Sequence, residues 1–208
     1  MGKKIRNIVF DLGGVLIDLD RDACVQAFAE LGFPQADLLL DPYRKSGIFL
    51  KLELGATTPQ ELYDHIRHET GRETAPEAIN AALCRFLVDL PEYKLDMLRE
   101  LRKRFKIFML SNTNAIMMPY IAEHLFTRQG GTMGDYFDRI FLSYEMKLAK
   151  PDPEIFQMMA RESALVPEET LLIDDSPANV AAAETLGFRT YLAGKCEDFR
   201  PIFTHLLG

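Results

Sequence analysis

Residues 170–175 have the sequence TLLIDD, an apolar run that ends abruptly in two adjacent carboxylates, Asp174 and Asp175. Residues 8–11, IVFD, follow the same pattern and end in Asp11. Short apolar runs bounded by polar residues are typical of interior strands in a parallel sheet. Ligands of such sheets bind at the carboxyl ends of the strands. We therefore expect the three acids to meet at one edge of the sheet.

Mutual repulsion among these acids indicates a bound cation. Carboxylates that share a small site raise one another's pKa unless a positive group offsets their charge. Carboxylate oxygens are hard ligands, of the kind that Mg²⁺ takes in proteins. The sequence therefore predicts magnesium as the cofactor.

The strand pattern predicts an α/β fold with a Rossmann-like parallel sheet. Five apolar runs are the predicted strands: 5–10, 106–110, 139–143, 170–173 and 189–192. From the second run onward helical segments separate them, as in a sheet built with crossover helices. The chain between the first two strands is far longer than one crossover helix requires, and much of it has a helical pattern. We expect an inserted α-helical domain over residues 18–90, and a core made of residues 1–17 and 91–208.

Capping patterns mark the expected helices. Thr58-Pro59-Gln60-Glu61 predicts a capping box with Pro at the first helical position, and Gly71 predicts the end of that helix. Asp152-Pro153 and Ser176-Pro177 predict two more helix starts of the same kind. Further helical runs are expected over 22–31, over 76–88 and from Pro91 to about Phe105. Pro119 leaves the start of a helix after Ser111 undecided.

Composition limits the class of protein. With 48% hydrophobic and 26% charged residues, the chain is expected to fold as a globular protein. A net charge of −7 argues against nucleic acid or an anionic membrane as the main partner. No apolar stretch is long enough to span a membrane, and the first residues do not form a secretory signal. Three scattered cysteines without a C-x-x-C pair predict reduced thiols and a cytoplasmic location. Nothing in the sequence indicates an oligomeric state.

Four motifs carry the polar residues that follow predicted strands: FDLGGVL at 10–16, LSNTN at 110–114, KPDP at 150–153 and DDSPAN at 174–179. The first three have ordinary structural alternatives, namely a turn aspartate, a helix cap and a solvated lysine. The adjacent acids of the fourth motif do not, because paired carboxylates at the end of an apolar strand are costly without a counter-charge.

In this order the four motifs resemble those of the haloacid dehalogenase-like hydrolase superfamily. The resemblance extends over nearly the whole chain, because the helical insert is similar to the small cap domain of that superfamily. The forms of motifs one and two are most similar to those of phosphatases, such as a bacterial glucose-1-phosphate phosphatase and, less closely, the phosphatase domain of soluble epoxide hydrolase. Glu53-Leu54-Gly55 in the insert is similar to a Glu-Arg-Gly segment of such relatives, although spacing assigns it no role.

The resemblance implies a magnesium-dependent phosphatase that hydrolyses a small phosphorylated metabolite through an aspartyl-phosphate intermediate. Sugar phosphates are among the substrates that it implies. It implies a role for each matching position. The implied catalytic residues are Asp11 as nucleophile, Ser111 and Lys150. The implied substrate-binding residues are Ser111, Asn112 and Lys150. The implied metal ligands are Asp11, Asp175 and the Gly13 carbonyl. Asp174 and Asn179 are implied to contact these ligands and not the ion itself.

Gly13 departs from the pattern of many phosphatases of this superfamily. They carry a second Asp two residues after the nucleophile, which acts as the general acid for the leaving oxygen. Glycine has no proton to donate, and general acid catalysis typically contributes about 10²–10⁴-fold. Our hypothesis is that the enzyme prefers leaving groups that need little protonation, such as anomeric or aryl phosphates, or takes an acid from the cap.

Two other functions stay open from the sequence. A haloacid dehalogenase would use the same Asp11 without a metal, although the paired Asp174 and Asp175 disfavour it. A catalytically silent phosphate-binding regulatory protein is the other alternative, because Gly13 lacks the acid. The sequence does not determine which phosphorylated substrate is used or which cap residues select it.

Overall fold

The computed structural model describes residues 3–40 and 46–207, and its centre is a five-stranded parallel sheet. The strand order is β5 (Arg139–Leu142), β4 (Lys106–Ser111), β1 (Asn7–Phe10), β6 (Thr170–Asp174) and β7 (Arg189–Leu192). All five predicted strands are therefore present, and the predicted α/β, Rossmann-like fold is confirmed. β1 is the middle strand, and its Phe10 lies between Met109 of β4 and Ile173 of β6.

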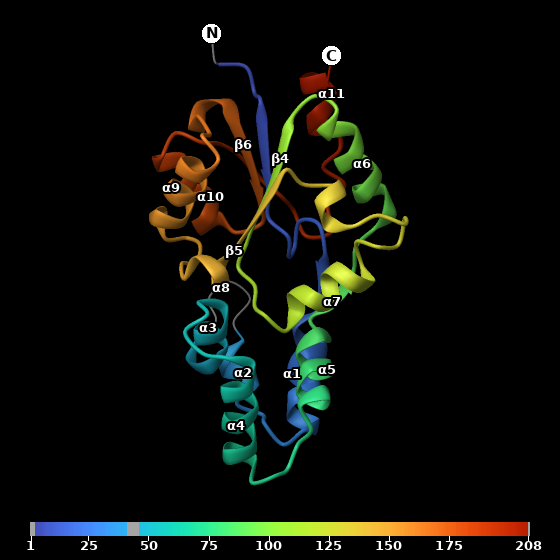
Figure 1. Ribbon diagram of the computed structural model, residues 1–208, viewed down its shortest axis with the longest axis vertical. Coiled ribbons are helices and arrows are strands. Elements are labelled where there is room, and N and C mark those ends of the chain that lie inside the picture. The colour runs from blue at the N-terminus through green and yellow to red at the C-terminus, as the bar shows by residue number, and fades with distance from the viewer. Residues whose placement is uncertain (1–2, 41–45, 208) are drawn as a thin grey trace.

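Helices cover both faces of the sheet. In Figure 1, α9 (Pro153–Glu162) and α10 (Pro177–Thr185) lie on one side, and α6 (Glu92–Arg102) and α11 (Pro201–Leu207) lie on the other. The strands alternate between two apolar clusters, as the two-residue period of a strand requires. Val9 packs with Phe156 on the α9 and α10 side, whereas its neighbours Ile8 and Phe10 belong to the larger cluster on the other face.

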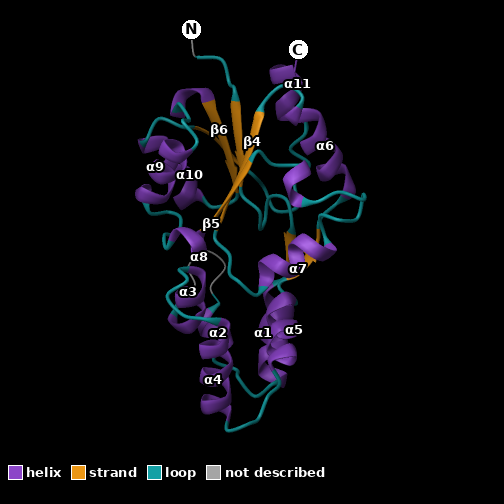
Figure 2. Ribbon diagram, viewed as in Figure 1, coloured by secondary structure: helices purple, strands orange, loops and turns teal. Residues whose placement is uncertain are grey.

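The helical insert between β1 and β4 lies beyond the carboxyl ends of the strands (Figures 1 and 2). Its helices are α1 (Arg21–Glu30), α2 (Ala36–Leu39), α3 (Gly47–Glu53), α4 (Pro59–Thr70) and α5 (Pro76–Cys84). The predicted capping box of α4 is present, with Thr58 and Glu61 bonded reciprocally, and Gly71 closes the helix at φ 63°. Five residues of the insert, 41–45, lie outside the described part of the chain.

The predicted helix over 76–88 is wrong at its end. α5 stops at Cys84, and Leu87–Asp89 form β3, which pairs antiparallel with β2 (Asp18–Leu19). These two strands are the two connections between the insert and the sheet domain, so their pairing depends on a contact across the whole insert. Local helical periodicity contains no information about such a contact.

The β2–β3 pairing places Asp18 opposite Asp89, although like charges in directly opposed positions are destabilising. Each of the two aspartates pairs with a cationic side chain. Lys94 Nζ lies 3.5 Å from Asp18 Oδ1 and donates to the Val15 carbonyl at 2.7 Å, while Arg128 pairs with Asp89. Lys94 comes from α6 and Arg128 from the loop after α7 (Met117–His124), so both cations are outside the insert.

Several predicted boundaries differ in detail. Pro119 is the third residue of α7, in the first turn, where no intrahelical N–H bond is required. Asp152 caps α9 by accepting from Glu154 N, as predicted, but the Ser176 side chain makes no cap bond to α10. The strand predicted to reach residue 143 ends at Leu142, because Ser143 begins the short helix α8 (Ser143–Met146). Two single 3₁₀ turns, Met133–Asp135 and Pro167–Glu169, complete the regular structure.

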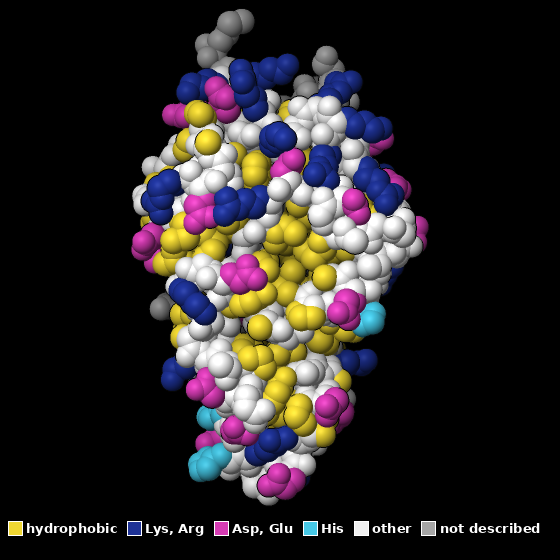
Figure 3. Space-filling model, viewed as in Figure 1, with side chains coloured by type: hydrophobic (Ala, Val, Ile, Leu, Met, Phe, Trp, Pro, Cys, Tyr) yellow, Lys and Arg dark blue, Asp and Glu magenta, His cyan; other side chains and the backbone are white. Residues whose placement is uncertain are grey.

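Over the part of the chain that the structure describes, every helix is too short or too polar to cross a lipid bilayer. On the face shown in Figure 3, Lys and Arg side chains gather over the sheet end, whereas hydrophobic side chains are visible down the middle of the molecule.

Candidate active site

Asp11 directly follows β1, the middle strand, at the carboxyl edge of the sheet. Its backbone N–H donates to the Ile173 carbonyl at 2.9 Å, which extends the β1–β6 ladder by one bond. Its carboxylate accepts the N–H of Leu12 at 2.6 Å, and the residue is only 8% exposed. Asp11 is therefore fixed in position by the strand before it and by the turn after it.

Lys150 brings a buried positive charge to this carboxylate. Its Nζ lies 2.9 Å from Asp11 Oδ1 and 2.7 Å from Asp174 Oδ2. The Asn112 side chain fixes the Lys150 backbone from both sides, because its amide NH₂ donates to the Lys150 carbonyl and its oxygen accepts the Lys150 N–H, each at 2.9 Å. The ends of motifs two and three are therefore joined directly.

Asp174 accepts hydrogen bonds from three donors. Besides Lys150 on Oδ2, its Oδ1 accepts the Ser176 N–H and the Asn179 side-chain amide, both at 2.9 Å. Asp174 is fully buried, whereas the adjacent Asp175 turns toward the open side of the site. Asp174 therefore lies away from the open side of the site, and Asn179 donates to it while also lining that side.

The donor set fits a hard divalent cation. Oxygen atoms of Asp11, Asp174 and Asp175 all lie within 4.8 Å of one another. Lys150 offsets only part of their summed charge, and oxygen-rich surroundings of this kind suit Mg²⁺. The Gly14 backbone packs directly against the Asp175 carboxylate, because a β-carbon at that position would lie only 2.1 Å from Asp175 Oδ2.

The pKa values of Asp11, Asp175 and Lys150 are all raised, and the excess of negative charge in the site contributes to each rise. Burial raises the pKa of Asp11 to about 7, with Asp174 and Asp175 adding to the rise and Lys150 opposing it. Burial also raises the pKa of Asp175, again with a contribution from Asp174. For Lys150, burial alone would lower the pKa, but Asp11 and Asp174 outweigh it, so that its pKa is raised and it stays protonated.

Two adjoining hollows open onto these groups. The outer hollow, about 560 Å³, includes Asp11, Lys150, Asp175 and Asn179 in its lining, and the inner hollow, about 370 Å³, includes Ser111 and Thr113. The residues that line both are Gly13, Leu19, Glu53, Phe86 and Asn112.

All the residues singled out from the sequence are brought together here, with Ser111 on the inner hollow and Asp174 behind the outer one. Leu19 and Phe86 were not anticipated. They belong to the β2–β3 connection, whose pairing has no local signal. Glu53 was noted without a role, and the fold carries it from the end of α3 into both hollows.

Comparison with known proteins identifies the family. A family model described as haloacid dehalogenase-like hydrolase matches residues 5–187. The chain belongs to the haloacid dehalogenase-like hydrolases. The matched residues include all four motifs and the insert between the first and second motif.

Three relatives of this family cover nearly the whole chain. A D-ribitol-5-phosphate phosphatase from Bacteroides thetaiotaomicron is 39% identical, covering 98% of this chain and 99% of its own length. The crystal structure of a wild-type HAD family enzyme from the same organism, in complex with magnesium and inorganic phosphate, has a TM-score of 0.91 at 42% identity and covers 96% of this chain and 99% of its own. A predicted HAD-like family hydrolase from Porphyromonas gingivalis has a TM-score of 0.92 at 40% identity, covering 99% and 98%.

Proposed function

We propose that this protein is a magnesium-dependent phosphatase that hydrolyses a small phosphorylated metabolite. The observation that carries the proposal is the position of Asp11, a buried carboxylate on the central strand beside Lys150 and two further acids. Its relatives include a phosphatase named for a sugar-alcohol phosphate and a structure with magnesium and inorganic phosphate. Both are near 40% identical over almost the full chain, which supports the same chemistry here.

The residues that would hold magnesium are Asp11, Asp175 and the Gly13 carbonyl, with Asp174 orienting Lys150 and the loop behind them. When bound, the ion supplies positive charge that lets a phosphate dianion approach three carboxylates. The same charge would lower the pKa of Asp11 from the value near 7 that burial imposes, and so keep the carboxylate ionised.

Asp11 would act as the nucleophile. One of its carboxylate oxygens attacks phosphorus, the bond from phosphorus to the alcohol oxygen breaks, the departing oxygen takes a proton from water, and an aspartyl-phosphate forms. Water then attacks that phosphorus and releases inorganic phosphate and free Asp11. Lys150 would neutralise charge on the transferred group, and Ser111 and Asn112 would lie against the phosphoryl oxygens.

We propose that residues 18–90 act as a cap over the core made of residues 1–17 and 91–208. The cap supplies Leu19, Glu53 and Phe86 to the hollows, so the site is complete only when the two parts are together. Closure of such a lid excludes water during phosphoryl transfer and opening releases product. We also propose a cytoplasmic location, which is supported by the absence of a disulfide among Cys24, Cys84 and Cys196, all three within the described residues.

The experiment that tests the function measures inorganic phosphate released from D-ribitol 5-phosphate and from p-nitrophenyl phosphate. We expect turnover that stops with EDTA and returns with added Mg²⁺. Asp11→Asn is expected to lower the rate by several orders of magnitude while the circular dichroism spectrum stays native. Phosphate release that survives both EDTA and Asp11→Asn would contradict the proposal.

Two controls separate the rival functions. Chloride release from 2-chloropropionate without metal would identify a dehalogenase. Binding of inorganic phosphate without turnover of either ester would identify a silent phosphate-binding protein.

A further inference from the structure

Lys94 is a buried lysine that the proposed mechanism does not use. It lies in the first turn of α6, the helix that leads from the insert back to the sheet domain (Figure 1), and it is only 1% exposed. Lysine is rarely buried to this extent without a partner, and a cation in the first turn of a helix is also disfavoured by the helix dipole. The contacts of its ammonium group must therefore offset two unfavourable contributions.

The ammonium group contacts three separate segments. Its Nζ donates to the Val15 carbonyl at 2.7 Å and lies 3.5 Å from Asp18 Oδ1, which is longer than a good hydrogen bond. The same Nζ lies 5.9 Å from the centre of the Phe199 ring, within the range of a cation–π interaction. A hydrogen bond from a charged donor is stronger than one between neutral groups. The closest contact of Lys94 therefore joins it to the backbone of motif one.

The Val15 carbonyl belongs to the turn of residues 12–17, which directly follows the nucleophile. Gly14 N–H donates to the Ile17 carbonyl, and Ile17 N–H donates to the Leu12 carbonyl, both at 2.8 Å. These bonds hold the turn together but do not join it to another element. Lys94 supplies such a bond from α6, and so fixes the turn relative to the sheet domain.

This turn carries two parts of the proposed magnesium site. The Gly13 carbonyl is one of the proposed ligands, and the Gly14 backbone packs against Asp175, which is another. Movement of the turn would therefore displace the Gly13 carbonyl from the two carboxylates, or press Gly14 onto Asp175. Mg²⁺ requires near-ideal octahedral geometry with ligands at about 2.0–2.1 Å, so small displacements weaken its binding.

We propose that Lys94 is a positioning residue for the magnesium site, which acts by holding the turn of residues 12–17 through the Val15 carbonyl. The inference rests on the proposed phosphatase function and adds to it a residue that acts through another group. Contacts that support metal ligands typically contribute about 10–100-fold to metal affinity.

Lys94→Met tests this, because it keeps an unbranched side chain and removes the bond to Val15. We expect the Kd for Mg²⁺ to rise about tenfold or more. Urea unfolding at a series of Mg²⁺ concentrations measures this Kd without substrate, since an ion that binds only the folded state stabilises it according to its concentration relative to Kd. The Mg²⁺ concentration for half-maximal hydrolysis of D-ribitol 5-phosphate should rise in parallel, with kcat near the wild-type value at saturating Mg²⁺.

Asp18→Asn is the matched control. It removes the ion pair with Lys94 and leaves the bond to Val15 in place, so the Kd for Mg²⁺ should stay at the wild-type value. The double variant Lys94→Met/Asp18→Asn removes both charges and leaves neither without its partner, which favours folding if Lys94→Met alone is too unstable. Its Kd for Mg²⁺ should rise as in Lys94→Met.

Three results overturn the inference alone, each with a wild-type protein that responds to Mg²⁺. The first is a wild-type Kd in Lys94→Met and in the double variant, whatever the loss of stability, because it indicates a purely structural role. The second is an equal rise in Asp18→Asn, because the ion pair would then carry the effect. The third is a fall in kcat at saturating Mg²⁺ with an unchanged Kd. If Mg²⁺ neither stabilises the wild-type protein nor activates hydrolysis, the proposed function fails and the inference falls with it.

Discussion

At Gly14 the absence of a side chain serves two separate purposes. Its φ is 77°, which L side chains rarely adopt, and a β-carbon there would overlap the Asp175 carboxylate at 2.1 Å. The first requirement is general for tight turns, whereas the second belongs to this site. The two contributions can be separated, because Gly130 has a similar φ of 75° and no atom within 4 Å of its β-carbon position.

We predict that Gly14→Ala lowers activity much more than stability alone explains. Displacement of Asp175 should weaken magnesium activation by about tenfold or more, since supporting contacts of a metal site typically contribute 10–100-fold. Gly130→Ala should cost about 1 kcal/mol of stability from backbone strain and leave magnesium activation unchanged. Magnesium titration of phosphatase activity checks both variants, and equal effects from the two would contradict the argument.

The raised pKa of Asp11 predicts how stability depends on pH in the metal-free protein. Its ordinary value of 3.8 rises to about 7 in the folded state. Below about pH 4 both states are protonated, and between about 4 and 7 the folded state alone holds the proton, so the free energy of unfolding falls as pH rises through that window.

Asp11→Asn removes this penalty. In EDTA at pH 8 the variant should be more stable than wild type by about 1 kcal/mol or more, and the difference should vanish near pH 3. Urea unfolding at the two pH values measures it. A variant that is less stable than wild type at pH 8 would show that the Lys150 ion pair outweighs burial of the carboxylate.

At the scale of elements, the residue before the first turn determines how well the start of a helix is stabilised. α4 begins with a complete capping box, whereas Ser46 occupies the same position before α3 and its side chain makes no cap bond. The sequence S/T-x-x-E is present before α4 and absent before α3, where Phe49 stands three residues after Ser46, which is why the start of α4 was predictable.

Thr58→Ala should therefore lower the free energy of unfolding by about 1 kcal/mol, the usual contribution of an N-cap side chain. Ser46→Ala is the matched control and should change it by a few tenths at most. Thermal and urea unfolding provide the measurement. A similar loss in both variants would mean that the bonds between Thr58 and Glu61 contribute little to stability.

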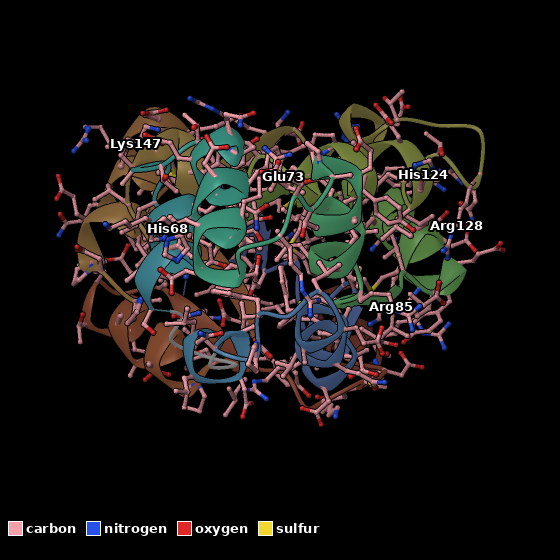
Figure 4. All side chains as sticks on the ribbon, turned by 90° about the horizontal axis from the view of Figure 1, so that it is seen from below. His68, Glu73, Arg85, His124, Arg128 and Lys147 are labelled. Atoms are coloured by element: carbon pink, nitrogen blue, oxygen red, sulfur yellow. The ribbon has the colours of Figure 1, made fainter. Side chains whose placement is uncertain are left out.

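At the scale of the whole molecule, the insert is attached to the core on two opposite sides. Arg128 pairs with Asp89 of β3 at one side, and Lys147 bonds to the Gly55 carbonyl at the other. The view from below shows Arg128 and Lys147 on opposite sides of the molecule (Figure 4). The first contact is at the connection of the insert, and the second is at the segment that carries Glu53.

If the insert acts as the proposed cap, loss of the second contact should favour its open arrangements. We predict that Lys147→Met raises KM about two- to tenfold, which corresponds to one hydrogen bond of about 0.5–1.5 kcal/mol, while kcat stays near the wild-type value. Lys103→Met, which removes an exposed pair with Glu100, is the control. Steady-state kinetics on D-ribitol 5-phosphate measure both, and an unchanged KM in Lys147→Met would refute a closing role for this contact.

The sequence by itself determined the sheet, the main helices and the identity of the acids at the strand ends. Each of these depends on short-range rules: apolar runs make buried strands, and Asp, Ser or Thr before Pro begins a helix. Parallel strands end at one edge, so the sequence placed Asp11 and Asp174–Asp175 at the same edge of the sheet, and the pairing of β1 with β6 brings them together there.

Tertiary structure alone decided the remaining contacts, because they join residues far apart in the chain. The β2–β3 pairing, the Asn112 bridge to Lys150 and the Gly55 contact with α8 each depend on packing between elements that no local pattern encodes. For the same reason no local pattern assigned a role to Glu53. Only the docking of the insert on the core brings it into the lining of both hollows.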